Sequence, residues 1–139
     1  PFYPGSGALD EVGAGLGEGT TVNVPMPDGA GDIAYIKAFR EILVPAADWF
    51  KPDLVLVSAG FDPHRFDLAL NLGYDGFKAL TAIVQDIAAT HCKGRLAFVL
   101  EGGYHLDSLA GGKVPEPREV GLQEVEEAAE FHREAFTED

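Results

Sequence analysis

Two residues near the middle of the chain, Asp62 and His64, have side chains that can bind a metal ion. They lie in LVSAGFDPHRFD, residues 56–67, where an apolar run stops at Gly60. Carboxylate and imidazole both suit zinc, but a catalytic zinc site needs about three protein ligands. Asp62 could instead cap a helix or accept hydrogen bonds from loop amides. His64 could be a second ligand, a residue that supports a ligand, or an ordinary loop residue.

A tyrosine that could take part in catalysis, Tyr104, follows two glycines in EGGY, residues 101–104. Glycines lack side chains and tolerate positive φ, so a backbone that contains them can approach a substrate closely. A phenol at such a place can donate a hydrogen bond to a developing oxyanion. The residues alone leave a second interpretation open, in which the ring packs beneath the loop.

The glycine-rich N-terminal segment offers no comparable chemistry. Glycines alternate in GAGLGEG, residues 13–19, and the run precedes an expected strand. A dinucleotide-binding fingerprint has a different spacing, follows a strand and opens a helix. We therefore interpret residues 1–20 as an irregular loop and not as a nucleotide site.

The elements expected to position Asp62 and Tyr104 are two short apolar runs. Residues 54–58 and 96–100 are continuous and apolar, which is typical of strands buried on both faces of a parallel sheet. Ligands of such sheets bind beyond the carboxyl ends of the strands. Since Asp62 and Tyr104 each follow one run, we expect them to emerge at the same edge of the sheet.

Helical periodicity occupies the intervals between the apolar runs. One helix is expected after Asp32, its N-cap, with a kink or division at Pro45, and a second should end near Gly94. A further strand is expected over residues 21–27 and a short helix over residues 106–110. This alternation predicts an α/β fold, an open parallel sheet with flanking helices.

Composition divides the chain into two segments. Residues 1–112 carry the α/β pattern, and residues 113–139 are predicted to form an acidic amphipathic helical tail. The apolar stripe of this tail contains Leu122, Val125, Ala129 and Phe136. Glutamates cover most of the remaining surface, which favours a solvated outer face, with a partner-binding helix as the alternative.

Charge and cysteine content limit the expected partners and setting. The formal net charge is −13, so we expect neither nucleic acid nor an anionic membrane as the main partner. The single cysteine, Cys92, cannot form an internal disulfide, and a cytoplasmic setting is the default. No apolar stretch approaches the roughly 18 residues of a membrane-spanning helix. The opening at Pro1 is typical of mid-protein sequence, so we expect a portion of a longer protein.

Several segments together resemble the zinc-dependent histone deacetylase and acetylpolyamine amidohydrolase superfamily, in its class II and bacterial form. The resemblance covers residues 1–111 and rests on PFYPGSG, TVNVPMPDGAGD, FKPDLVLVSAGFDPHR and LEGGYHLDSLA. It implies an arginase/deacetylase-like sheet and a hydrolase that removes acetyl groups from acetyl-lysine side chains or acetylpolyamines. Zn²⁺ is the implied cofactor, with Fe²⁺ as an alternative, because both accept carboxylate and imidazole ligands.

The resemblance assigns roles to individual residues. Asp62 matches a zinc ligand, Tyr104 matches the tyrosine that stabilises the tetrahedral intermediate, and Tyr3 matches the aromatic residue of the acyl-lysine tunnel. Gly103 matches a position where backbone approaches the alkyl stem of the substrate. His64 has a counterpart in the family but is not expected to be a ligand.

Parts of the family's site have no match among these 139 residues. The missing parts are an upstream Asp-x-His pair of zinc ligands and the His-His pair that serves as general base and acid. We therefore expect the chain alone to be inactive. The loop after His64 is also shorter than the family pattern, so Ala69 receives no role.

The alternative function is an inactive module that forms a homo-oligomer or binds a partner, because bare strand edges and apolar faces attract partners.

Overall fold

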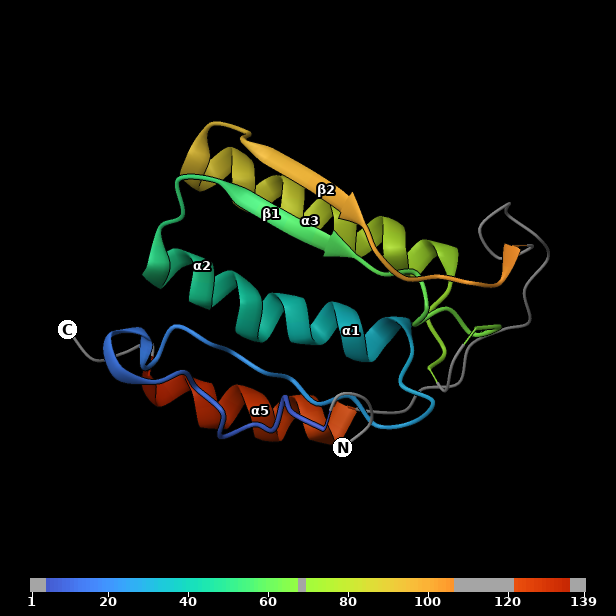
Figure 1. The fold of residues 1–139 in the computed structure, drawn as a ribbon, viewed down its shortest axis with the longest axis horizontal. Helices are drawn as coiled ribbons and strands as arrows, with labels where there is room; N and C mark the ends of the chain where they lie inside the picture. The colour runs from blue at the N-terminus through green and yellow to red at the C-terminus, as the bar shows by residue number, and fades with distance from the viewer. Residues whose placement is uncertain (1–4, 68–69, 107–121, 136–139) are drawn as a thin grey trace.

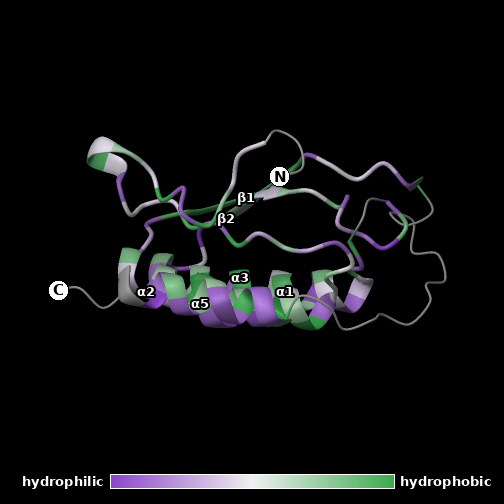
Figure 2. Ribbon diagram, turned by 90° about the horizontal axis from the view of Figure 1, so that it is seen from below, coloured by the Kyte–Doolittle hydropathy of each residue, from purple (hydrophilic) through white to green (hydrophobic). Residues whose placement is uncertain are grey.

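The computed structural model describes residues 5–67, 70–106 and 122–135. Figure 1 shows the path of the chain, and Figure 2 shows the helices gathered in one layer, with the strands and the N-terminal segment on the other side. The elements in chain order are η1 (Gly15–Gly17), α1 (Asp32–Ala38), η2 (Phe39–Leu43), α2 (Val44–Phe50), β1 (Val55–Ala59), α3 (Tyr74–Cys92), β2 (Leu96–Leu100) and α5 (Leu122–Ala135).

The two strands β1 and β2 pair in parallel, with Val55 opposite Leu96 and Ala59 opposite Leu100. Parallel neighbours need a crossover connection, and α3 provides it. The predicted α/β architecture with a parallel sheet is therefore confirmed. The strands themselves match the predicted runs to within one residue.

The prediction that both faces of these strands are buried is wrong for the described residues. Along β1 the side chains alternate, so that Val55 is half-buried and Leu56 is 67% exposed. Val55 packs against a cluster formed by Ala47, Ile83 and Ile87 of the helix layer. Successive strand residues face opposite sides of a sheet, and the described helices lie on one side only.

The helix predicted after Asp32 continues through Pro45 to Phe50, and the predicted irregularity takes the form of a π turn just before Pro45. Between α1 and α2, residues Phe39–Leu43 form η2, in which the N–H of Val44 donates to the carbonyl of Phe39. Pro45 follows at the start of α2. A proline has no N–H to donate and its ring crowds the preceding helical turn, so a locally widened turn accommodates it.

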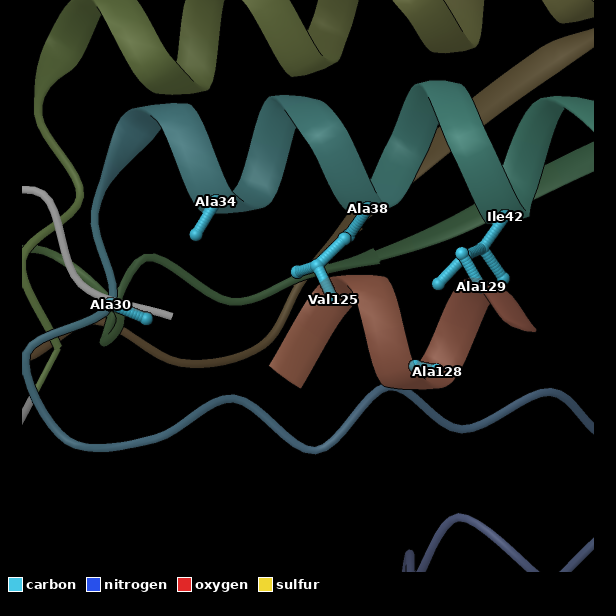
Figure 3. Packing of buried hydrophobic residues seen from close by; sticks show 7 residues of the cluster. All are labelled: Ala30, Ala34, Ala38, Ile42, Val125, Ala128 and Ala129. Carbon is cyan, nitrogen blue, oxygen red and sulfur yellow. The ribbon is translucent and has the colours of Figure 1, made fainter. Parts of the chain in front are cut away.

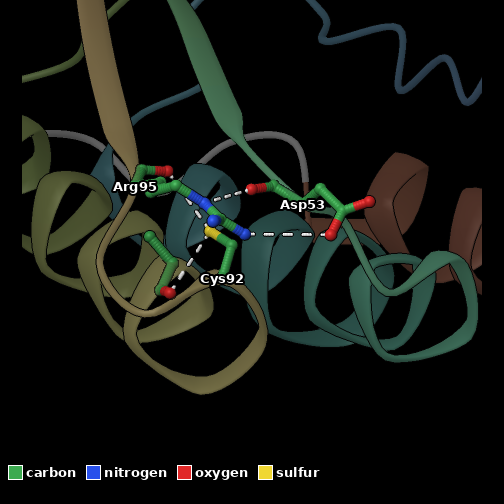
Figure 4. Close-up of polar contacts among 4 residues, drawn as sticks. Asp53, Cys92 and Arg95 are labelled. Atoms are coloured by element: carbon green, nitrogen blue, oxygen red, sulfur yellow. Dashed lines mark hydrogen bonds and ion pairs between the residues drawn. The ribbon is translucent and has the colours of Figure 1, made fainter.

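The long helix α3 ends where the sequence predicts, just before Gly94. Gly94 has φ +78, and its N–H donates to the carbonyl of Ala88 at 2.8 Å. The buried thiol of Cys92 donates to the carbonyls of Ala88 and Arg95, at 3.3 and 3.2 Å (Figure 4). In the part of the chain that the structure describes, no helix combines the length and apolar character that crossing a bilayer requires.

The strand predicted over residues 21–27 does not form. This segment runs alongside α5 (Figure 1), where its side chains Val22, Val24 and Met26 pack partly buried against the α1–α5 core. Prolines at positions 25 and 27 lack the N–H groups that a strand ladder needs. The apolar residues of this segment therefore indicate packing beneath a loop and not strand pairing.

The tail helix α5 packs on α1 and buries Val125 and Ala129 of the predicted apolar stripe, with Leu122 partly buried, whereas Phe136 lies outside the described residues. Figure 3 shows the shared core, in which Val125 is fully buried and faces α1. An ion pair between Lys37 and Glu126 joins the same two helices at their surface. The cluster comprises Ala30, Ala34, Ala38, Ile42, Val125, Ala128 and Ala129. The boundary between residues 112 and 113 stays a prediction, and the helix predicted over residues 106–110 lies, apart from Leu106, outside the described residues.

Candidate functional site

The segments that follow β1 and β2 remain side by side after the strands end. The N–H of Glu101 donates to the carbonyl of Ala59 at 3.1 Å, and the N–H of Phe61 donates to the carbonyl of Gly102 at 2.9 Å. The parallel pairing thus continues one step past each strand. The prediction that the Asp62 and Tyr104 segments emerge at the same edge of the sheet is confirmed.

The Asp62 carboxylate occupies a space that two glycines leave open. A Cβ atom added to Gly102 would lie 2.1 Å from Oδ1 of Asp62, and one added to Gly60 would lie 2.7 Å from it. Real Cβ atoms do not approach another atom that closely. Glycine at both positions therefore allows the Gly-Phe-Asp and Glu-Gly-Gly-Tyr segments to interlock around this carboxylate.

Gly103 is required for two separate reasons. Its φ is +115°, a conformation that residues with a Cβ atom rarely adopt. A Cβ atom there would also lie 2.8 Å from Cβ of Phe61. The backbone of the second segment consequently rests directly on the first.

Tyr104 presents its ring outward, since 75% of the residue is exposed. The alternative in which the ring packs beneath the loop is therefore wrong. Its backbone is held instead by Asp67, whose Oδ2 accepts the N–H of Tyr104 at 2.6 Å and that of His105 at 2.9 Å. Two hydrogen bonds to Asp67 therefore hold the backbone that carries the exposed phenol.

His64 is a buried residue of the β1–α3 loop, with only 2% of its surface exposed. Its ring centroid lies 5.1 Å from that of Tyr74 and 5.6 Å from that of Phe66, and its Nδ1 accepts the N–H of Phe66 at 3.4 Å. Burial lowers the pKa of this imidazole, and the charges of Arg65 and His105 lower it further. These surroundings favour a neutral ring that packs among the aromatic side chains of the loop. That His64 is not a metal ligand stays a prediction.

Asp32 does not cap its own helix, as the sequence had suggested. The N-cap of α1 is Gly31, and Asp32 is the first helical residue. Its Oδ1 accepts the N–H of Gly73 at 2.6 Å, at the start of α3. A Cβ atom on Gly76 would lie 2.4 Å from the same oxygen. The side chain of Asp32 therefore links the first turn of α1 to the first turn of α3.

Tyr35 of α1 interacts with the site through the charge of Asp62. Burial raises the pKa of its phenol to about 12, and the negative charge of Asp62 adds to the increase. The phenol is therefore protonated at neutral pH.

A complete metal site is not formed by the residues that the structure describes. Among residues 5–67, 70–106 and 122–135, no group of three or more His, Cys, Asp or Glu side chains is placed to hold one ion. Asp62 accordingly offers a single carboxylate. Tyr3 and Ala69 lie outside the described residues, so the structure does not place them.

Asp67 is the residue of this site that sequence reasoning missed. A signal was present, since aspartates in short loops often accept hydrogen bonds from backbone N–H groups. The donors, however, are 37 and 38 residues further along the chain. Nothing in the local pattern around residue 67 indicates them.

Comparison with known proteins identifies the family. Residues 1–113 match the histone deacetylase domain. The chain is 44% identical over 136 residues to histone deacetylase 14, chloroplastic, of Arabidopsis thaliana, a match that covers 96% of the chain and 32% of that relative. It is 41% identical over 105 residues to the histone deacetylase-like amidohydrolase of Pseudomonas aeruginosa, covering 74% of the chain and 28% of that relative.

The fold agrees with this assignment. The crystal structure of the HDA15 HD domain matches with a TM-score of 0.81 at 38% identity, over 96% of this chain and 40% of that chain. The chain spans about a third of the length of the curated relatives described above. Its parallel α/β arrangement is that of the arginase/deacetylase-like fold. The chain therefore belongs to the histone deacetylase domain family, within the histone deacetylase and acetylpolyamine amidohydrolase superfamily.

Proposed function

We propose that the chain is the C-terminal portion of a metal-dependent amidohydrolase that removes acetyl groups from acetylated lysine side chains or acetylpolyamines. The observation that carries the proposal is the interlock of the Asp62 carboxylate with Gly102. This contact brings Asp62, the proposed metal ligand, next to the segment that carries Tyr104, the proposed oxyanion donor. Both lie at one edge of a parallel sheet. Active sites of such sheets lie at that edge.

In this proposal Asp62 is one of three protein ligands to Zn²⁺, with Fe²⁺ as the alternative ion. The other ligands would come from an Asp-x-His segment that these 139 residues do not contain. A metal bound there polarises an amide carbonyl. The described residues supply one ligand only, so the remaining assignments concern what the chain's own side chains do around the substrate.

Tyr104 is proposed to donate its phenolic proton in a hydrogen bond to the oxyanion that forms from the acetyl carbonyl. Its outward-facing ring supports this role. Single oxyanion donors in other enzymes are worth roughly 3 kcal/mol of transition-state stabilisation. Tyr3 would line the tunnel for the alkyl stem, and the Gly103 backbone would lie against that stem.

Without the His-His pair that acts as general base and acid, the chain alone is expected to be inactive.

The proposed setting is the cytoplasm, because a single cysteine cannot form an internal disulfide. Its net charge of −13 supports a substrate other than nucleic acid.

The direct test uses the full gene product, including any residues that precede Pro1. We expect stoichiometric zinc and release of acetate from acetyl-lysine peptides or acetylpolyamines. Asp62→Asn should lose the metal, whereas Tyr104→Phe should keep the metal and lose most of the turnover. A full-length product that neither binds zinc nor releases acetate from either substrate class refutes the proposal.

A second function, self-association without catalysis, is favoured by exposed apolar side chains around α2 and β1. Leu56 and Phe50 border a hollow of about 510 Å³ between α2 and β1, which apolar side chains line almost entirely. Apolar surface of this kind often marks an interface. Intact-mass measurement together with sedimentation of the purified chain tests it. A chain of full expected mass that stays monomeric at all attainable concentrations excludes this function.

A further inference from the structure

Two successive backbone N–H groups, those of Tyr104 and His105, converge on one oxygen of Asp67. The distances from these nitrogens to Oδ2 are 2.6 and 2.9 Å. Hydrogen bonds to an ionised carboxylate are shorter and roughly twice as strong as neutral ones. Adjacent amides that converge in this way form a concavity suited to a negative charge.

These two amides flank the Cα atom of Tyr104. The first belongs to the peptide unit before Tyr104 and the second to the peptide unit after it. Holding both units restrains φ and ψ of Tyr104, and these two angles set the direction of its Cα–Cβ bond. The carboxylate of Asp67 therefore sets the direction of the Tyr104 phenol through the backbone and not through a direct contact.

Other contacts act on the residues on either side of Tyr104: the carbonyl of Gly102 accepts the N–H of Phe61 at 2.9 Å, and the ring of His105 lies 5.7 Å from that of Phe66. Residues 101–105 have no regular secondary structure, and the ring of Tyr104 is mostly exposed. The residue before it, Gly103, lies against Phe61 through its backbone alone. Without the carboxylate, the two N–H groups that flank the Cα atom of Tyr104 would lose the acceptor that holds them.

Asp67 itself is firmly held. Its N–H donates to the carbonyl of His64 at 2.8 Å, and His64 forms a bridge with the buried Leu72. The N–H of Arg65 donates to the carbonyl of Leu72 at 3.1 Å. A turn anchored by the buried His64 thus supports the carboxylate, and the carboxylate supports the tyrosine segment.

We infer that Asp67 is the positioning residue for Tyr104, fixing the phenol where it meets the developing oxyanion. The catalytic meaning of this inference rests on the proposed function, whereas the geometry rests on the two hydrogen bonds. The sequence motifs that resemble the family assign no role to this carboxylate. Its predicted effect is on the rate of the chemical step and not on metal binding.

The first experiment tests the geometry in the chain itself by ¹H–¹⁵N NMR. Asp67→Asn keeps the size of the side chain and removes its charge. The amide proton signals of Tyr104 and His105 should both move upfield, and both protons should exchange faster with solvent. Unchanged signals at both amides would overturn the inference, whatever the activity of the full-length protein.

The matched control is Asp53→Asn, the same chemical change at the opposite end of the sheet. Asp53 is exposed, and its carboxylate lies 3.8 Å from a guanidinium nitrogen of Arg95 (Figure 4). This variant should leave the signals of Tyr104 and His105 in place. Equal shifts in both variants would attribute the effect to net charge and refute the specific contact.

The second experiment is a double-mutant cycle in the full gene product. Asp67→Asn should lower kcat about tenfold, with KM and zinc content unchanged, since a transition-state contact is misaligned. With Tyr104→Phe already present, Asp67→Asn should change kcat by less than about twofold, because no phenol is left to aim. Independent, multiplicative losses would assign Asp67 a general structural role and overturn its part in catalysis.

The two experiments separate the inference from the proposed function. If the wild-type full-length protein releases no acetate, the proposed function fails, and the NMR result still decides whether Asp67 positions Tyr104. If acetate is released and the amide signals do not respond to Asp67→Asn, the proposed function stands and the positioning role fails.

Discussion

Gly102→Ala is the sharpest test of the interlock between the two segments. The added Cβ would lie 2.1 Å from Oδ1 of Asp62, so this oxygen or the backbone must retreat by about 1.3 Å to reach the 3.4 Å of ordinary contact. The nearest atoms belong to the carboxylate of Asp62, and residue 102 is not among the glycines with positive φ. The cost of the substitution is therefore steric and not conformational.

Overpacking of this kind costs about 1–3 kcal/mol in well-packed sites. We expect Gly102→Ala to lower the free energy of unfolding by about 2 kcal/mol, measured by urea denaturation with an unchanged m-value. Gly94→Ala is the contrasting control, because it introduces strain at φ +78 and no clash within 4 Å. Its cost should be about 1 kcal/mol, from the left-handed backbone conformation alone.

The decisive comparison combines Gly102→Ala with Asp62→Ala. If the clash with the carboxylate is the cause, truncating Asp62 should remove most of the cost of Gly102→Ala, and the double variant should show strong coupling. Additive effects of the two substitutions, or a Gly102→Ala variant as stable as the parent, would refute the interlock.

Three further predictions concern the core, a phenol and the metal. Val125→Ala should lower the free energy of unfolding by about 2 kcal/mol, because Val125 is fully buried between α5 and α1, whereas Glu130→Ala on the exposed face should change it little in thermal melts. Tyr35 should ionise in the folded protein only near pH 12, followed by ultraviolet absorbance, and an ordinary titration near pH 10 would contradict its burial. Because the folded-state pKa lies above the unfolded value of 10.0, the contribution of Tyr35 to stability is present below pH 10 and falls as pH rises toward 12, and Tyr35→Phe should abolish this dependence. The 139-residue chain should not retain zinc stoichiometrically after dialysis, and tight one-to-one binding would show that further ligands exist within it.

The parts of the fold that the sequence predicted are those with local causes. Continuous apolar runs at residues 54–58 and 96–100, each followed by polar loop residues, were sufficient to place β1 and β2 and their common edge. Gly94 predicted the end of α3, and Pro45 predicted an irregularity, because each acts on its local turn.

The predictions that failed depended on neighbours distant in the chain. The apolar residues of 21–27 pack under α5, and β-branched side chains do so as readily as they form strands. Burial of both strand faces presumes covering layers on both sides, and the described helices cover one. Asp67 was missed because its partners come from the segment after the next strand, and no local pattern encodes that pairing.

The contacts of α5 have a consequence for how this chain folds. His132 hydrogen-bonds the carbonyl of Asn23 at 3.0 Å, across 109 residues, and Lys37 pairs with Glu126 across 89. Contacts so distant in sequence carry a large loop-closure cost and form late. Until α5 docks, the alanine face of α1 stays uncovered, so a chain in which α5 has not yet docked should be prone to aggregation.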